Sequence, residues 1–208
     1  YVYEQDARGN PTMIINRERL VDLKWPGTRW QWRGRVHEVL ECNPRVPFIQ
    51  DHDIVWRHYP SPGRQSAILR NHELLMMTLE EDPTEFRTLF YLGFQAAIDR
   101  KWAEAVGWFR QYLGKTEFTP EAWRAAEYCA DCIRCLAKEA MLAGDKQRHD
   151  VLQRDAIDMD YTAIDIIPRW ADPYFGLAES YCALGQWQKS LDWHEMGLGR
   201  EPCDPVIF

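Results

Sequence analysis

The stretch LFYLGFQAAIDRKWAEAVGWFRQYL, residues 89–113, decides the fold of this chain. Its apolar residues recur every three or four positions on either side of a break at Asp99–Lys101, which predicts two amphipathic helices joined by a tight turn. Gly93 and Ala105 are small enough to let two such helices approach closely, and Phe109 is large enough to fill the space between them. The stretch therefore predicts a helical hairpin.

The same spacing returns near the C-terminus, where the small and apolar positions are Leu177, Ala178, Tyr181, Gly185, Ser190, Gly197 and Pro202. In the first copy they are Leu92, Gly93, Ala96, Ala105 and Phe109. Both copies have the spacing of a tetratricopeptide repeat, and we expect Tyr181 to fill the second hairpin as Phe109 fills the first. Residues 120–170 predict a longer, degenerate helical pair between them.

Residues 64–208 are therefore expected to form an all-α tetratricopeptide-like solenoid of about three helical pairs. The amphipathic segment SAILRNHELLMMTLEED, which ends at Asp82-Pro83, predicts one more helix at 64–81 that caps the front of the solenoid. Residues 1–63 are predicted to be a separate, β-rich domain.

The composition excludes several classes of protein. The chain has 208 residues, a formal net charge of −7 and 46% hydrophobic residues, so it can bury a core. The acidic balance argues against coating nucleic acid by charge, and no apolar run approaches the ~20 residues that would cross a bilayer. Because Tyr1 is the first residue and reads as mid-strand, we expect the chain to be part of a longer polypeptide.

The cysteines Cys129, Cys132 and Cys135 have the spacing of a metal or Fe–S run. They lie in WRAAEYCADCIRCLAKEAM, which has no Gly or Pro and predicts a continuous helix. Such a helix would place the thiols on one face as small core residues, so a metal knuckle is not expected. Free thiols fit a reducing, cytoplasmic location.

Residues 1–60 predict strands and turns, with YVYEQ as a strand and DARGNPT as a hairpin tip. A polar cluster follows, interleaved with tryptophans, and consists of Arg17, Arg19, Arg33, Arg35, His37 and Glu38. Arginines beside a His–Glu pair suit a phosphorylated ligand, and tryptophans suit a sugar or a base. The alternative is an ordinary half-exposed sheet on which Arg and Trp alternate and His37 is a satisfied interior histidine.

The run INRERLVDLKWPGTRWQWRGRVHEVLE, residues 15–41, resembles the end of the catalytic domain of family 2 glycosyltransferases. The matching residues are Arg17, Arg19, Leu20, Trp32, Gly34, Val36, His37 and Glu38. Downstream, the segment that begins RHYPS is similar to the stretch that joins such domains to tetratricopeptide repeats. That second match is carried by His58, Tyr59, Arg70, Asn71, Leu74 and Leu75.

The resemblance implies an α+β chain, with the β-rich end of a GT-A-like catalytic domain at 1–63 and the solenoid at 64–208. It implies an enzyme that transfers a sugar from a nucleotide-sugar donor to an acceptor hydroxyl, with a nucleotide-binding half upstream of Tyr1. The acceptor, which would be a protein, a glycan or another polymer, would bind to the repeats. The alternative is a non-enzymatic tetratricopeptide interaction scaffold.

The resemblance also assigns roles to residues. It places His37 near a divalent metal, Mn²⁺ or Mg²⁺, and makes Glu38 the catalytic candidate within this chain. The residues that it implies for binding the substrate or the diphosphate are Arg17, Arg19, Trp32, Arg35 and His58.

Overall fold

The computed structural model describes residues 2–5, 11–14, 29–33, 39–43, 64–117 and 119–203. The chain forms two compact units, one of Tyr1–Thr78 with Pro205–Phe208 and one of Leu79–Asp204. Each unit is described by itself. The predicted domain boundary at residue 63 stays a prediction.

The described strands of the first unit form two antiparallel hairpins. Strand β1 (Val2–Gln5) pairs with β2 (Pro11–Ile14), and β3 (Arg29–Arg33) pairs with β4 (Val39–Asn43). The strand expected at YVYEQ is confirmed by β1, whereas Pro11 and Thr12, which were expected in the hairpin tip DARGNPT, belong to β2. Each sheet in this described part has two strands.

Helix α1 (Arg64–Glu81) ends where the sequence predicts, directly before Asp82-Pro83. The Asp82 side chain then accepts a hydrogen bond of 3.0 Å from the backbone N–H of Thr84 and closes the turn after the helix. Most of α1 belongs to the first unit, so its expected role as a cap on the solenoid stays a prediction.

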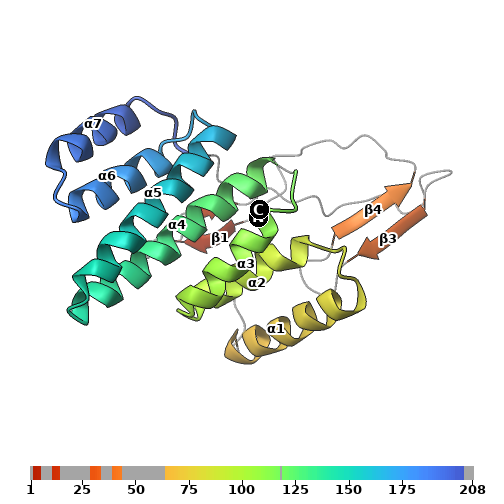
Figure 1. Cartoon of the computed structure of the whole chain (residues 1–208). Helices are drawn as coiled ribbons and strands as arrows, with labels where there is room; N and C mark the ends of the chain where they lie inside the picture. Colours follow the sequence, from red (N-terminus) through yellow and green to blue (C-terminus); the bar gives the residue numbers. More distant parts are fainter. Residues whose placement is uncertain are drawn as a thin grey trace. The chain divides into compact units, whose positions relative to one another are not determined.

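In the described part of the second unit, six helices follow α1 and form three consecutive hairpins (Figure 1). They are α2 (Arg87–Ile98), α3 (Trp102–Leu113), α4 (Thr119–Leu142), α5 (Lys146–Ile166), α6 (Asp172–Ala183) and α7 (Trp187–Leu198). The break at Asp99–Lys101 and the stretched middle pair are confirmed. Three helical pairs are what the repeat spacing predicted.

The three hairpin turns share one geometry. The turn residue in each has a positive φ: 58° at Arg100, 79° at Gly144 and 74° at Gly185. The next residue donates its backbone N–H to a carbonyl five residues earlier; the first of these bonds, from Lys101 to Ala96, is 2.9 Å long. This is the Schellman arrangement, which satisfies carbonyls at the end of a helix and reverses the chain.

The hairpins stack in two rows. Phe94 of α2 contacts Tyr128 of α4 with 5.6 Å between ring centroids, and α4 contacts α6 in turn, so α2, α4 and α6 form one row. In the other row, Arg110 of α3 pairs with Asp155 of α5, and Tyr161 of α5 packs on the ring of Trp193 of α7. A two-row stack of helical hairpins is an α-solenoid.

The core lies between the two rows and is built from aromatic and small side chains. Gly93 of α2 has no room for a side chain, because a Cβ there would lie 2.8 Å from the ring of fully buried Phe109 of α3. In the last hairpin the glycine and the aromatic residue lie on the opposite helices: Gly197 is on the second helix, α7, and lies against the ring of Phe175 on the first helix, α6. Close approach of two helices at a glycine is the packing that the spacing predicted.

The third hairpin departs from the sequence prediction at Tyr181. This side chain is half-buried, and its hydroxyl lies 3.2 Å from that of Tyr161 on α5, while Lys189 of α7 lies over its ring. Phe175, and not Tyr181, fills the space beside the glycine. The prediction was wrong because the aromatic residue that packs on the glycine, Phe175, lies on the first helix of its hairpin, whereas Phe109 lies on the second helix.

The cysteines of α4 behave as the helix predicted. Cys129 and Cys132 are buried, Cys135 is half-buried, and all three are free thiols on one continuous helix. Among the residues that the structure describes, no cluster of His, Cys, Asp or Glu could hold a metal ion. None of the helices in this part is long and apolar enough to span a membrane.

Candidate protein-interaction surface

Of the site residues that the glycosyltransferase resemblance implied, the structure describes Trp32. Trp32 lies in β3, where it pairs with Leu40 of β4. The other expected site residues lie outside the described residues; they are Arg17, Arg19, Arg35, His37, Glu38 and His58. Their roles stay untested predictions, and so does the divalent metal.

Helices α2, α4 and α6 carry a mixed set of exposed and half-exposed side chains, and we call the set named next the α2–α4–α6 face. It consists of Phe94, Ile98, Tyr128, Asp131, Cys135, Lys138, Phe175, Glu179 and Cys182. Lys138 and Glu179 form an ion pair of 3.0 Å that joins α4 to α6. The face therefore offers apolar side chains between charged ones, as interfaces between proteins do.

An ion pair beneath this face fixes α4 against α5. Arg134 donates from Nη1 to Oδ2 of Asp160 over 2.7 Å, and from Nη2 to Oδ1 of Asp131 over 2.7 Å. Burial raises the pKa of Asp160 to about 7, although the Arg134 charge acts against the rise. Asp131 reaches the surface, so the core pair is linked directly to the α2–α4–α6 face.

A second charged pair lies on the first turns of α4. Arg124 and Glu127 form an ion pair of 3.1 Å in which both side chains are about nine-tenths buried, with 13% and 14% exposed. Burial, and next the neighbouring charge of Asp131, raises the pKa of Glu127 to about 7. The Arg124–Glu127 pair thus belongs to the interior of the helical unit, and Asp131 is a neighbouring carboxylate that reaches the surface.

Helix α2 is held to α4 by a third polar contact. Nη2 of Arg87 lies 2.7 Å from Oε2 of Glu121, whose side chain is fully buried, and Tyr112 donates its hydroxyl to Oε1 of Glu121 over 2.6 Å. Burial, and next this hydrogen bond, raises the pKa of Tyr112 above its ordinary value. Polar contacts to a fully buried carboxylate thus hold α2 against α4, through Glu121, and α4 against α5, through Asp160.

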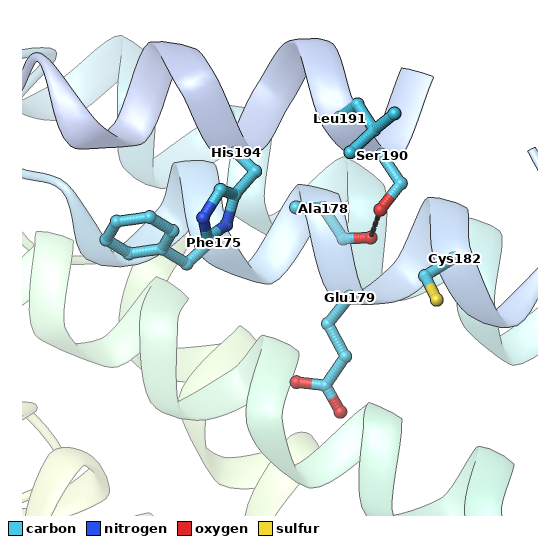
Figure 2. Close-up of a pocket in the computed structure, with 7 residues that line it drawn as sticks. All are labelled: Phe175, Ala178, Glu179, Cys182, Ser190, Leu191 and His194. Carbon is cyan, nitrogen blue, oxygen red and sulfur yellow. Dashed lines mark hydrogen bonds between the residues drawn. The ribbon is translucent and has the colours of Figure 1, made fainter. Parts of the chain in front are cut away.

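Two shallow depressions flank Glu179. The first, of about 450 Å³, lies on α6 and α7 (Figure 2). In it the rings of Phe175 and His194 contact each other at an angle of 54°, with 5.3 Å between centroids, and Ser190 donates its hydroxyl to the carbonyl of Ala178 over 2.8 Å. Exposed Cys182 lines its other end.

The second depression, of about 380 Å³, lies where the end of α4, the start of α5 and the end of α6 meet. We call it the Gln153 pocket. Its lining residues are Lys138, Met141, Leu142, His149, Gln153, Glu179 and Ala183. Nothing in the sequence pattern marked it, because its residues come from three helices.

Comparison with known proteins agrees with the geometry. No family model matches the chain, and no curated protein matches it. Its helical part has a tetratricopeptide-like fold. A P212121 crystal structure of MamA AMB-1 matches with a TM-score of 0.52 and 18% identity, over 65% of this chain and 64% of that one. A C2221 structure of MamA AMB-1 matches with a TM-score of 0.50 and 17% identity, over 66% of this chain and 71% of that one.

These findings correct two predictions. The identification of the chain as a family 2 glycosyltransferase is wrong, and so is the glycosyltransferase activity assigned to it. The solved structures that it resembles are tetratricopeptide-like helical proteins, and the likeness concerns the fold alone. The fold class is corrected likewise: the helical solenoid is shown, whereas a GT-A-like β-rich part is not. The nucleotide sugar and the upstream catalytic half that were expected as partners have no support.

Proposed function

We propose that the helical part of the chain is a protein-interaction scaffold, whose α2–α4–α6 face binds a peptide segment of a partner. The observation that supports this most directly is the continuous row of α2, α4 and α6, with two depressions on either side of Glu179. Solenoids of stacked helical pairs typically bind partners along such extended surfaces.

The charges of this face favour a basic partner segment with apolar anchors. Asp131 and Glu179 contribute exposed carboxylates, each in an ion pair with one cation, Arg134 or Lys138, and Arg134 is itself buried against Asp160. A partner lysine or arginine can approach the exposed carboxylates, and apolar side chains can enter the depressions.

The test is selection of a random peptide library displayed on phage against the 208-residue chain. Enriched peptides are then titrated by calorimetry against the wild type and two charge-reversal variants. Glu179→Lys changes the proposed face, whereas Asp158→Lys makes the same change at an exposed position of α5, in the other row. We expect Glu179→Lys to weaken binding about three- to tenfold at low salt and Asp158→Lys to leave it unchanged.

Two results would contradict the scaffold function on this face. One is that no peptide is enriched above the background of the immobilisation matrix. The other is that both variants, or neither, change the affinity, because binding would then not depend on the α2–α4–α6 face.

A further inference from the structure

Helix α7 is the last helix of the described stack, and it leaves one side exposed. In each earlier hairpin the second helix packs on the first helix of the next hairpin, so that α3 packs on α4 and α5 packs on α6. In the described part of the chain no further hairpin follows, and α7 packs chiefly on α6. Gly197 is the buried residue of α7, and the rest of this helix is exposed or half-exposed.

The exposed side of α7 carries four uncharged or aromatic side chains in line, which we call the α7 stripe. Trp187, Leu191, His194 and Leu198 follow one another at intervals of 4, 3 and 4 residues, and the helical period places them within about 60° around the axis. Trp187 is 65% exposed, Leu191 58% and Leu198 69%. Leu191 and His194 also line the first depression (Figure 2).

The acidic and basic side chains of α7 lie away from the stripe. They are Lys189, Asp192 and Glu195, and the helical period places each of them at least about 70° from the centre of the stripe. A continuous line of large apolar side chains, with the charges on the other sides of the helix, is what a helix presents to another helix.

The spacing of the α7 stripe is the same when it is read from either end. Two antiparallel copies of α7 therefore bring Trp187 opposite Leu198 and Leu191 opposite His194, each contact occurring twice about a two-fold axis. The stack itself uses this orientation, because short connections make α4 antiparallel to α3 and α6 antiparallel to α5. A second copy of α7 thus continues the arrangement that already stacks the hairpins.

The area of the stripe suits a weak dimer. A large apolar side chain has about 150–250 Å² of surface, so the exposed parts of Trp187, Leu191 and Leu198 amount to roughly 300–450 Å² on each copy. Two copies then bury roughly 600–900 Å² from these side chains, and with their neighbours about 1,000 Å², which is the low end of specific interfaces.

We propose that the chain forms a weak symmetric homodimer in which the α7 stripes of two copies pack antiparallel. This pairing goes beyond the binding of a peptide and does not depend on it. None of the residues that line the Gln153 pocket lies on α7.

The experiment is sedimentation equilibrium of the 208-residue chain between about 10 µM and 1 mM. We expect the average mass to rise from the 24.6 kDa of one chain towards twice that value. Leu191→Lys should weaken association about tenfold or more, because it places a charge in an apolar contact. Val151→Lys makes the same kind of change on α5, at a position that is 56% exposed, and should associate as the wild type does. Circular dichroism checks that both variants keep their helical content.

A mixture of two variants tests the antiparallel contact itself. His194→Glu alone should also weaken association, because it places a carboxylate against Leu191 of the second copy. Mixed in equal amounts, Leu191→Lys and His194→Glu should associate more tightly than either variant alone, because the two positions face each other and then carry opposite charges. Unfolding of a variant could not produce this recovery.

Three results would overturn the proposal. The first is a wild type that keeps the mass of one chain up to millimolar concentration, which would leave the α7 stripe to a helix of another protein. The second is that Leu191→Lys and Val151→Lys affect association equally, because self-association would then use another surface. The third is a mixture that associates no better than its components, which rejects the antiparallel pair. The peptide selection is read separately, so either proposal can fail while the other stands.

Discussion

Arg134 of α4 and Asp160 of α5 form an ion pair inside the helical core, with 2.7 Å between Nη1 and Oδ2. Asp160 is fully buried, and the Arg134 side chain is 6% exposed. Helix α6 approaches the pair at Gly176, where a Cβ would lie 2.6 Å from Oδ1 of Asp160 and 2.9 Å from Nη1 of Arg134. Residues of three helices thus meet at this ion pair.

Replacing Asp160 by Asn should strongly destabilise the helical unit. The variant leaves the guanidinium of Arg134 in the core with only Asp131, a surface residue, as its charged partner. Loss of one partner of a buried ion pair costs about 3–5 kcal/mol in the free energy of unfolding, measurable by urea denaturation at pH 8, above the pKa of about 7 of Asp160, where its carboxylate is charged. Asp158→Asn, at an exposed position on the same helix, is the control and should change stability by less than about 0.5 kcal/mol. Equal stability of the two variants would show that the pair is dispensable.

Two Gly→Ala substitutions should have effects of opposite sign. Gly176→Ala places a methyl group against the ion pair and should cost about 1–3 kcal/mol, because the core has no room for it. Gly107 lies in the interior of α3, and a Cβ there would meet no neighbouring atom within 4 Å, so Gly107→Ala should stabilise by about 0.5–1 kcal/mol through helix propensity. Thermal unfolding of both variants tests this, and a stabilising Gly176→Ala would contradict the packing described.

The sequence predicted the helical hairpins because their signals are local. The break at Asp99–Lys101, the stop at Asp82-Pro83 and the small residue Gly93 all act within a few positions of where they stand. The Gly144 and Gly185 turns follow the same rule, since glycine adopts positive φ readily. Arg100 also has a positive φ, but because it is not a glycine its residue type did not indicate this conformation.

The candidate surface could not be predicted in this way. Arg134 and Asp160 are 26 positions apart, and only the folded α4–α5 hairpin brings them together. The Gln153 pocket combines residues of three helices, none of which forms a motif. The glycosyltransferase identification was wrong for a related reason: a match such as Val-His-Glu at residues 36–38 records residue types in order, and not the three-dimensional site that gives them chemistry.

Stability should increase as the pH falls from 8 to 6 through the side chain of Glu127. Its pKa is raised from 4.5 to about 7 in the folded state, chiefly by burial, so the folded chain binds a proton in this range that the unfolded chain does not. The stabilisation is therefore complete below pH 4.5 and is lost as the pH rises through about 7.

The measurement is urea denaturation of the wild type and of Glu127→Gln at pH 8 and pH 6. The wild type should gain about 1 kcal/mol relative to the variant on acidification. Glu139→Gln, at an exposed position of the same helix, is the matched control and should follow the wild type. A wild type that loses stability relative to Glu127→Gln would mean that the Arg124 charge, and not burial, dominates the environment of Glu127.

Alkylation of the native chain by iodoacetamide at pH 8 should distinguish the cysteines of the helical unit. Cys182 is exposed on the α2–α4–α6 face and should react first. Burial raises the pKa of Cys129 and of Cys132 to about 12, so at pH 8 these thiols are protonated as well as covered. Peptide mapping by mass spectrometry should find Cys129 and Cys132 unmodified until urea unfolds the chain, after which all three react. Modification of either at the rate of Cys182 in the native chain would place α4 at the surface and contradict the core described here.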